Sequence, residues 1–257
     1  MLRKEDIQKY LTVPGITLDL RETVTSTNTL LKELGRQGAP HGTVMVAEQQ
    51  TAGRGRLGRS FYSPAQSGVY FSILLRPGCS SDDAMLMTPA AAVAVAEALE
   101  EVSGAEAQIK WVNDVYIAGL KVCGILTEAA FTPEGKLDFA VVGIGINLTP
   151  PEGGFPEDIL GKAGSLFCNA HEDVRARVVA LVLSRFMPML SRLPERAFAP
   201  AYRKRNMLKN RRVDVISGDR STPALVLDVD DRLRLLVRFD DGTEQAIATG
   251  EVTIRLN

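Results

Sequence analysis

Cysteine and histidine are scarce in this sequence, and their scarcity excludes several kinds of site. Its 257 residues include 3 cysteines, Cys79, Cys123 and Cys168, that lie far apart with no CxxC pair. This spacing argues against a disulfide framework and a thiolate metal site, and it fits a reducing cytoplasm. The 2 histidines, His41 and His171, are isolated and lack metal-ligand spacing. The sequence offers no Ser–His–Asp or Cys–His arrangement, so it predicts no covalent nucleophile.

An excess of charge and a long apolar run are also missing. Lys and Arg number 30 against 31 Asp and Glu, a net charge of −1. Non-specific binding to nucleic acid or to an anionic membrane usually needs a clear positive excess. The most apolar stretch, 85–99, contains Thr88, Pro89 and Glu97 and falls short of the roughly 20 residues of a membrane span. Charged side chains stand where a signal peptide would be apolar. We therefore expect no nucleic-acid partner, no membrane partner and no export by a signal peptide.

The overall composition, with 45% apolar and 24% charged residues, is typical of soluble globular proteins. Helical spacing predicts helices that begin near Ser26 and that cover 88–102, 174–193 and 201–206. Runs of β-branched and aromatic residues predict strands at 42–48, 68–75, 109–117, 121–130 and 139–146. The turn at 118–120 predicts that 109–117 and 121–130 form a hairpin.

After Asn210 the sequence pattern changes, and the chain consists of short runs that are typical of β-strands. These runs lie at 213–216, 224–228, 233–239, 243–248 and 251–256. They predict a small β-barrel. We therefore expect an α+β protein, with a mixed-sheet domain over 1–207 followed by the barrel over 208–257.

The most informative segment runs from Gln50 to Arg59 and reads QTAGRGRLGR. Its three glycines let the backbone approach a ligand, and Arg54, Arg56 and Arg59 can converge on it. Arginine binds phosphate or carboxylate oxygens in pairs, and exposed backbone N–H groups add to that. The spacing matches neither a Walker loop nor a GxGxxG motif that opens a helix. The segment therefore predicts an anion-binding loop, with a solvated surface loop as the alternative.

A second polar cluster, Lys110-Trp-Val-Asn-Asp114, lies at the edge of the predicted hairpin. It offers a cation, an amide and a carboxylate within five residues. Asn113 and Asp114 are also turn formers, and Trp111 suits a core. Lys121 lies on an otherwise apolar strand, where it either extends to solvent or faces an anion.

Two further groups carry a structural and a functional interpretation each. Ser26-Thr27-Asn28 can cap a helix, bind a polar head group, or do both. Gly143-Ile-Gly-Ile-Asn147 ends a strand with two glycines and an amide. That arrangement permits close backbone approach to a ligand, although glycines also simply relieve crowding in strands.

In order and spacing, several motifs together resemble the biotin protein ligase family. They are Ser-Thr-Asn, Gln-Thr-Ala-Gly-Arg-Gly-Arg, Lys-Trp-x-Asn-Asp, Lys-Val-x-Gly-Ile-Leu-x-Glu, Gly-Ile-Gly-Ile-Asn and a final Gly-Glu-Val-x-x-Arg. The resemblance runs from about Ser26 to Arg255 and implies the biotin/lipoate ligase fold with an SH3-like barrel. Only ~20 residues precede the pattern, too few for the winged helix–turn–helix of bifunctional members, so it implies the monofunctional type.

The resemblance also implies a reaction with two steps. The carboxylate of biotin attacks the α-phosphate of ATP to give biotinyl-5′-AMP, and a lysine of a biotin carboxyl carrier protein or domain then attacks the mixed anhydride. Biotin and ATP are the implied substrates, with Mg²⁺. Fixed cations stabilise the charge that develops in both steps.

Site residues follow from the same resemblance. The implied catalytic residues are Lys121, Arg54 and Arg56. The implied biotin-binding residues are Ser26, Thr27, Asn28, Gln50, Arg54, Gly55, Arg56, Lys121 and Gly124. The implied ATP- or adenylate-binding residues are Arg54, Arg56, Phe61, Lys110, Asn113, Asp114, Lys121, Asn147 and Arg255. The resemblance leaves the metal ligands open, with a phosphate-bridging Mg²⁺ near Asp114 as the candidate, and matches Glu251 to a position that supports ATP or acceptor binding.

Three positions depart from the family pattern: Phe61 replaces a tryptophan, Val112 a proline and Cys123 an alanine. The cysteines suit packing positions, and for Cys123 a place near the predicted ligand is the alternative, because it lies beside Lys121 in the sequence. Three other functions stay open: a lipoate or octanoate ligase or transferase of the same fold, a non-catalytic biotin sensor, and a nucleic-acid-binding module. The sequence does not identify the acceptor or the oligomeric state, and a homodimer through a sheet edge is one arrangement.

Overall fold

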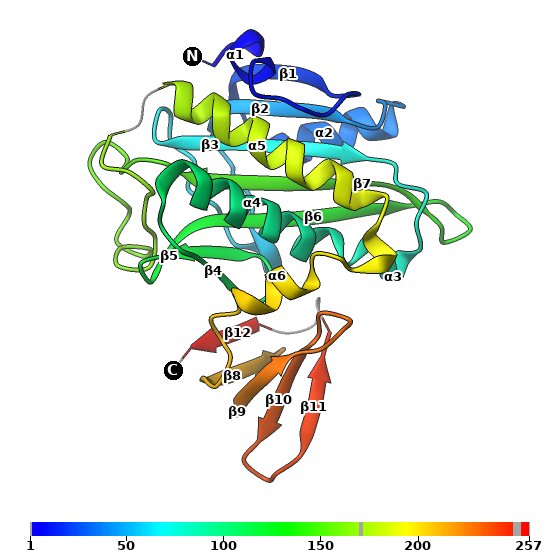
Figure 1. Ribbon diagram of the computed structural model, residues 1–257, viewed down its shortest axis with the longest axis vertical. Coiled ribbons are helices and arrows are strands. Elements are labelled where there is room, and N and C mark those ends of the chain that lie inside the picture. The colour runs from blue at the N-terminus through cyan, green and yellow to red at the C-terminus, as the bar shows by residue number, and fades with distance from the viewer. Residues whose placement is uncertain (1, 170–171, 249–252, 257) are drawn as a thin grey trace.

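The computed structural model describes residues 2–169, 172–248 and 253–256, and its larger part is built on a seven-stranded sheet (Figure 1). The strands are β1 (Thr17–Val24), β2 (Thr43–Gln50), β3 (Gly68–Leu75), β4 (Ala107–Lys110), β5 (Asp114–Ile117), β6 (Leu120–Phe131) and β7 (Leu137–Asn147). Their order across the sheet is β1-β2-β3-β7-β6-β5-β4. β1 and β2 are parallel and all other neighbours are antiparallel. The predicted mixed sheet is confirmed.

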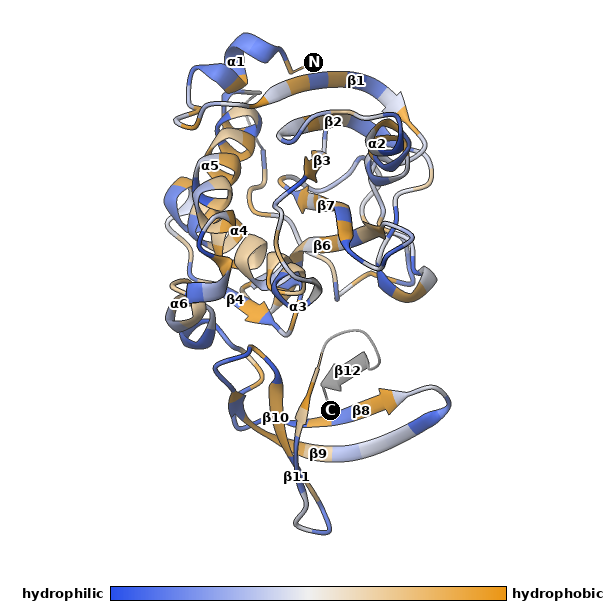
Figure 2. Cartoon of the chain, turned by 90° about the vertical axis from the view of Figure 1, so that its right-hand side faces the viewer, coloured by the Kyte–Doolittle hydropathy of each residue, from blue (hydrophilic) through white to orange (hydrophobic). Residues whose placement is uncertain are grey.

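Helices cover both faces of this sheet. They are α1 (Lys4–Gln8), α2 (Thr27–Arg36), α3 (Ser81–Ala84), α4 (Met87–Ser103), α5 (Glu172–Leu190) and α6 (Ala199–Lys204), with 3₁₀ turns η1 (Arg56–Gly58) and η2 (Leu193–Glu195). α4 and α5 pack on one face and α2 lies on the other (Figure 2). Each predicted helix is present, with ends that differ by a few residues.

The alternation of side chains along β2 explains the two faces. Val44 and Val46 join the main core, which includes α4 and α5, whereas Met45 joins a smaller core beneath Leu31 of α2. Gly35 lets α2 approach the sheet closely, because a Cβ there would lie 2.7 Å from Leu74 Cδ1. α4 is rich in alanine and valine and is buried on most sides, as expected of a helix between a sheet and another helix.

One prediction for this sheet is wrong. The run 109–117 is not one strand, because the chain turns at 111–113 between β4 and β5. Asn113 is a strong turn former, and here that preference outweighs the β-branched residues around it. The Lys110–Asp114 cluster therefore lies in the β4–β5 turn, not at the β5–β6 hairpin.

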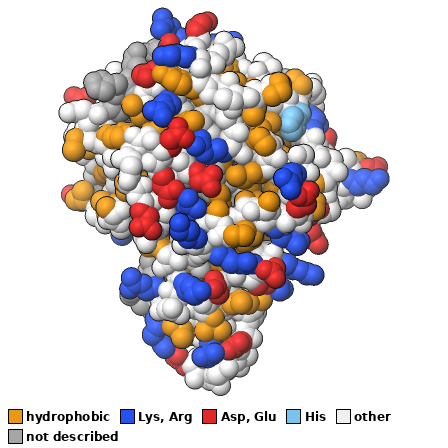
Figure 3. Space-filling model, viewed as in Figure 1, with side chains coloured by type: hydrophobic (Ala, Val, Ile, Leu, Met, Phe, Trp, Pro, Cys, Tyr) orange, Lys and Arg blue, Asp and Glu red, His pale blue; other side chains and the backbone are white. Residues whose placement is uncertain are grey.

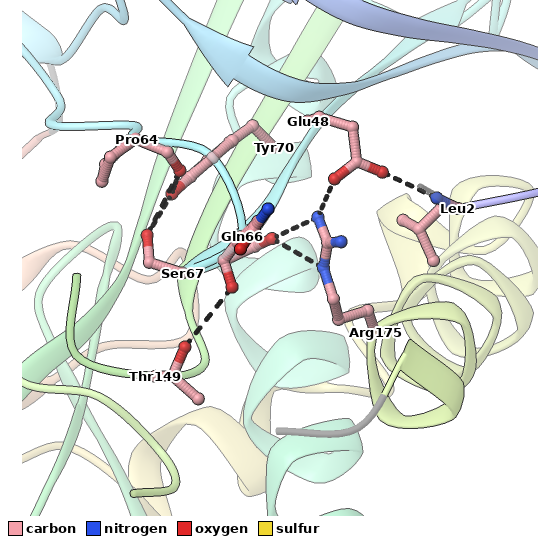
Figure 4. A network of polar contacts seen from close by, with 9 residues as sticks. Leu2, Glu48, Pro64, Gln66, Ser67, Tyr70, Thr149 and Arg175 are labelled. Carbon is pink, nitrogen blue, oxygen red and sulfur yellow. Dashed lines mark hydrogen bonds and ion pairs between the residues drawn. The ribbon is translucent and has the colours of Figure 1, made fainter. Parts of the chain in front are cut away.

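A buried polar network joins the N-terminal segment to the sheet (Figure 4). The guanidinium of Arg175 on α5 bonds Glu48 Oε2 at 2.6 Å and the carbonyl of Gly68 at 3.0 Å, and its side chain is only 6% exposed. The backbone N–H of Leu2 donates to Glu48 Oε1 at 2.7 Å. Burial opposes ionisation of Glu48, but these bonds outweigh it and hold its pKa below the ordinary value.

The C-terminal part forms a second, antiparallel sheet. Its strands are β8 (Arg212–Ser217), β9 (Arg220–Val229), β10 (Leu235–Phe239), β11 (Glu244–Ile247) and β12 (Thr253–Leu256), in the order β11-β10-β9-β8-β12. The small all-β domain predicted after Asn210 is confirmed and is consistent with the SH3-like type, while the division after residue 207 stays a prediction. Trp111 connects the two sheets, because its Nε1 donates to the carbonyl of Leu233 at 2.9 Å.

The molecular surface agrees with the near-zero net charge. Positive and negative side chains are interspersed on the face drawn in Figure 3. Among the residues that the structure describes, no helix is long and apolar enough to cross a membrane.

Candidate active site

A cavity of about 140 Å³ opens on the face of the sheet that carries α2. Three glycines of the neighbouring strands β6 and β7, Gly124, Gly143 and Gly145, line it. A Cβ on Gly143 would lie 2.0 Å from Asn28 Oδ1, and one on Gly145 would lie 2.5 Å from the Phe61 ring. The glycine pair of β7 thus permits the close approach that its sequence predicted, here by two side chains of the protein itself.

Most of the predicted site residues meet at this cavity. Those that line it are Ser26, Thr27, Asn28, Gln50, Arg54, Gly55, Arg56, Phe61, Lys110, Asn113, Asp114, Lys121 and Gly124. They come from the start of α2, the β2–β3 loop, the β4–β5 turn and β6, four segments far apart in the sequence.

Asn147 and Arg255 are not among the described residues that line the cavity. Asn147 ends β7, is largely buried and donates from Nδ2 to the carbonyl of Gly164 at 3.1 Å. The backbone of Arg255 lies in β12 opposite Asp214, and its side chain lies outside the described part of the chain. Glu251 also lies outside the described residues. The adenylate roles of Asn147 and Arg255 stay predictions.

A chain of hydrogen bonds arranges the polar floor of the cavity. Gln50 Oε1 accepts from the backbone N–H and the hydroxyl of Thr27, at 2.9 and 3.1 Å. Gln50 Nε2 donates to Ser63 Oγ at 3.0 Å and keeps a second proton that bonds nothing among the described residues. Gln50 therefore offers the cavity a donor.

Ser26 does not cap α2 with its side chain. It occupies the N-cap position, but no capping hydrogen bond from its side chain is present in the described structure. Its side chain lines the cavity, and the residue is only 2% exposed. Of the two interpretations of Ser26, side-chain capping is wrong, and a polar ligand contact stays a prediction.

Asn28 is held on both sides of its amide. Nδ2 donates to the carbonyl of Leu126 at 3.2 Å and to Glu128 Oε2 at 3.0 Å, and Oδ1 accepts from the hydroxyl of Ser72 at 2.6 Å. Both amide protons are used within the protein. Asn28 therefore shapes the cavity and has only acceptor capacity left for a ligand.

Cations dominate the walls. Among the described residues, five basic side chains line the cavity, namely Arg54, Arg56, Arg59, Lys110 and Lys121. Asp114 is the one carboxylate among the described lining residues. Its Oδ1 lies 2.8 Å from Lys121 Nζ and 2.9 Å from Asn113 Nδ2. Lys121 thus lines the cavity and pairs with Asp114 there, and the site as a whole suits an anion.

Burial lowers the pKa of two of these cations, Arg56 and Lys110. Burial lowers the pKa of Arg56, and Asp114 offsets part of that effect. Burial likewise lowers the pKa of Lys110, with Asp114 opposing and Lys121 adding to the shift. A bound anion would favour the charged form of both side chains, which is how an anion site gains affinity from clustered cations.

Phe61 lies over the glycines of β6 and β7. Its ring makes an edge contact with Tyr70, with centroids 6.4 Å apart and planes at 68°. The Tyr70 hydroxyl donates to the carbonyl of Pro64 at 2.9 Å, and burial raises the pKa of Tyr70 to about 12 (Figure 4). This contact anchors the segment that carries Phe61.

Of the two interpretations of Cys123, the packing role is confirmed. Its side chain is fully buried in the main core and is absent from the described lining of the cavity. Regular strand alternation would put Lys121 and Cys123 on the same face, but the register shift between them, where β5 pairs with β6, breaks that alternation. Burial raises the pKa of the Cys123 thiol. The described residues also contain no group of three or more His, Cys, Asp or Glu that could hold a metal.

Sequence reasoning missed the residues behind the cavity, above all Ser72 and Glu128. Glu128 ends the Lys-Val-x-Gly-Ile-Leu-x-Glu motif, four residues after Gly124. In a strand this spacing puts both residues on one face, which is the signal that was available. Ser72 stands in an apolar strand and carried no such signal.

Comparisons with known proteins identify what the chain resembles. A family model described as the Biotin/lipoate A/B protein ligase family matches residues 20–147. The bifunctional ligase/repressor BirA of Bacillus subtilis is 39% identical over 175 residues, which cover 68% of this chain and 54% of that protein. The chain thus spans about half the length of this relative.

Other matches cover nearly the whole chain. The biotin–acetyl-CoA-carboxylase ligase of Mycobacterium tuberculosis is 30% identical over 246 residues, which cover 91% of this chain and 88% of that protein. The solved structure of a biotin protein ligase from Aquifex aeolicus in complex with biotin and ATP matches with a TM-score of 0.78 and 29% sequence identity. The match covers 94% of this chain and 99% of that chain.

Proposed function

Because the chain belongs to the biotin/lipoate A/B protein ligase family, among its biotin protein ligases, we propose that it joins biotin to a lysine of a biotin carboxyl carrier domain. ATP is the co-substrate and biotinyl-5′-AMP the intermediate. The observation that carries the proposal is the cavity with five cationic side chains and one carboxylate. Such a cavity suits a ligand that gathers negative charge as it reacts.

The polar floor fits the uncharged end of biotin. Gln50 has an N–H that bonds nothing in the described part of the chain, Thr27 lies beside it, and Ser26 lines the same cavity. Donors and acceptors of this kind suit a cyclic urea, while Gly124 and Leu126 add a close, apolar wall. In this proposal Asn28 shapes the pocket, because its two amide protons are already used.

The cationic wall fits the reacting end. A biotin carboxylate oxygen attacks the α-phosphorus of ATP, an O–P bond forms, and the bond to the leaving diphosphate breaks. Lys121 and Arg56 stabilise the added negative charge, and Arg54 orients the carboxylate. No enzyme nucleophile is needed, since the substrate supplies its own. Asp114 pairs with Lys121, so the incoming anion competes with that carboxylate.

The second step uses the same wall. The amine of an acceptor lysine attacks the acyl carbon, a C–N bond forms, the C–O bond to AMP breaks, and the amine loses a proton. Cations that stay in contact with the phosphate improve AMP as a leaving group. Phe61 and Asn147 are the proposed contacts of the adenine, since aromatic rings stack with bases and amides bond their edges.

Asp114 fits a role in holding Mg²⁺ with the phosphates of ATP. Magnesium is commonly held by one or two carboxylates together with substrate phosphates and water, so one carboxylate suffices. The ion would neutralise phosphate charge. The cytoplasmic location, the lack of nucleic-acid and membrane partners, and the homodimer stay predictions.

Mass spectrometry of the intact acceptor tests the function. The protein is incubated with ATP, Mg²⁺, a biotin carboxyl carrier domain and one of three acids: biotin, lipoate or octanoate. The proposal expects the acceptor to gain the mass of a biotinyl group only with biotin and ATP together. An adduct with lipoate or octanoate instead would favour the related ligases, and tight biotin binding without any adduct would favour a sensor.

A further inference from the structure

Glu128 lies just behind the cavity and belongs to no role assigned above. It follows Gly124 and Leu126 on the same face of β6, and both of those residues line the cavity. Its partner across the sheet is Val141 of the smaller core under α2. Its side chain is only 15% exposed.

One carboxylate here connects three segments of the chain. Oε1 accepts from Lys32 Nζ of α2 at 2.8 Å, and Oε2 accepts from Asn28 Nδ2 at 3.0 Å. Arg54 Nη1, from the glycine- and arginine-rich loop, lies 3.1 and 3.2 Å from the two oxygens. Burial opposes ionisation of Glu128, but the bonds from Lys32 and Asn28 outweigh it and lower its pKa. The group therefore acts as a carboxylate at neutral pH.

Two of these three partners line the cavity. Because Glu128 and the Leu126 carbonyl only accept, they force the NH₂ group of Asn28 toward β6 and turn Oδ1 toward Ser72. Arg54 uses only Nη1 on Glu128, and its Nε and Nη2 bond nothing among the described residues. Those atoms are free for a second carboxylate.

We propose that Glu128 is a positioning residue for biotin binding, because it holds Asn28 and Arg54 in the orientations in which they face the cavity. This inference rests on the proposed function. Glu128 does not touch the ligand. It fixes one wall through Asn28 and keeps the guanidinium of Arg54 across the opening, next to where the carboxylate of biotin would lie.

Replacement of Glu128 should remove the contacts that hold Asn28 and Arg54 in these orientations. In Glu128→Gln the amide nitrogen cannot accept from Arg54 or Lys32, and the charge that attracts both is gone. Arg54 then loses its anchor. Biotin must order the side chain on binding, which weakens affinity. The adenylation chemistry itself depends on Lys121 and Arg56, which Glu128 does not contact, so it is spared once biotin is bound.

The experiment is calorimetric titration of the full-length protein with biotin alone, followed by steady-state kinetics. We expect Glu128→Gln to raise the biotin Kd about tenfold or more, the usual size for a lost charge-assisted contact. The biotin KM rises in parallel, whereas kcat at saturating biotin and the KM for ATP stay within about threefold.

Lys32→Met is the matched control. It removes an ion pair with the same carboxylate, but Lys32 is not among the described residues that line the cavity. We expect its biotin Kd to stay within about twofold of the wild-type value. If loss of an ion pair at Glu128 acted only through overall stability, both variants would behave alike.

Glu128→Asp protects the test against a folding failure. It keeps the charge but withdraws the carboxylate by one methylene, and we expect an intermediate loss of biotin affinity. An unchanged Kd in both Glu128 variants, or an equal rise in the KM values for biotin and ATP, would overturn the inference. Failure of the wild-type protein to bind biotin would instead refute the proposed function, and the inference with it.

Discussion

Lys121 Nζ lies 2.8 Å from Asp114 Oδ1 inside the cavity, so this carboxylate neutralises the charge of the lysine beside it. Asn113 bonds the same oxygen and Arg56 bonds Asn113, which links the β4–β5 turn to the arginine-rich loop. An anionic ligand therefore meets a Lys121 side chain that Asp114 already positions. Little reorganisation of this lysine is left for the reaction, which is the condition under which a fixed charge stabilises a transition state best.

Lys121→Met should abolish most of the adenylation. The change removes a cation from the point where negative charge develops, and the expected loss in kcat is about 10²- to 10³-fold. Formation of biotinyl-5′-AMP in a single turnover is the measurement. Thermal unfolding should stay close to wild type. A folded variant with near wild-type turnover would remove Lys121 from its assigned role.

The arginine-rich loop should resist trypsin when biotin is bound. Its Arg54, Arg56 and Arg59 are potential cleavage sites, and a segment of glycine and exposed polar residues opens easily unless a ligand holds it. We expect cleavage within 51–60 to slow markedly on addition of biotin, as followed by mass spectrometry of the fragments. Equal cleavage rates with and without biotin would contradict ordering of the loop by the ligand.

The three cysteines should differ in reactivity. Cys168 is exposed, Cys79 is half-buried, and Cys123 is fully buried with a raised pKa. A maleimide should therefore label Cys168 first and Cys123 only after denaturation. Peptide mapping of the labelled protein tests this order. Rapid labelling of Cys123 in the native protein would mean that it lines an open cavity after all.

Glu48→Gln should destabilise the fold by leaving Arg175 without its carboxylate. Removal of one partner from a buried ion pair costs about 3–5 kcal/mol. Because the folded pKa of Glu48 lies below its ordinary value, its contribution is present above that value and is lost as the pH falls. The difference in unfolding free energy between wild type and variant should be constant from about pH 7 to 5.5 and should shrink below about pH 4.5.

Urea unfolding at several pH values measures that difference. Glu22→Gln, on the exposed part of β1, is a matched control and should change stability little at any pH. A Glu48→Gln variant as stable as wild type at neutral pH would show that the network in Figure 4 contributes no net stability.

The motifs predicted the cavity because each places unusual residues within a few positions of one another. Arg54 and Arg56 among glycines, and Lys110 with Asp114, carry their chemistry in local sequence. The partners behind them do not. Ser72 meets Asn28 from a strand 44 residues away, and Glu128 meets it from 100 residues away. Only the register of β3, β7 and β6 brings them together.

The error over 109–117 has the same origin. The β-branched residues around Val112 predicted a continuous strand, but the turn preference of Asn113 prevailed. The choice between core and cavity for Cys123 also depended on pairing, because the register shift between β5 and β6 turns its side chain into the core. Strand pairing decides such cases, and pairing depends on residues distant in the sequence.

Exchange of labelled pyrophosphate into ATP measures whether this cavity activates biotin as an adenylate. We expect exchange that requires biotin, is absent with lipoate or octanoate, and is lost in Lys121→Met. Absence of exchange in a folded protein that binds both biotin and ATP would contradict activation of biotin in this cavity, as would exchange that proceeds equally well without biotin.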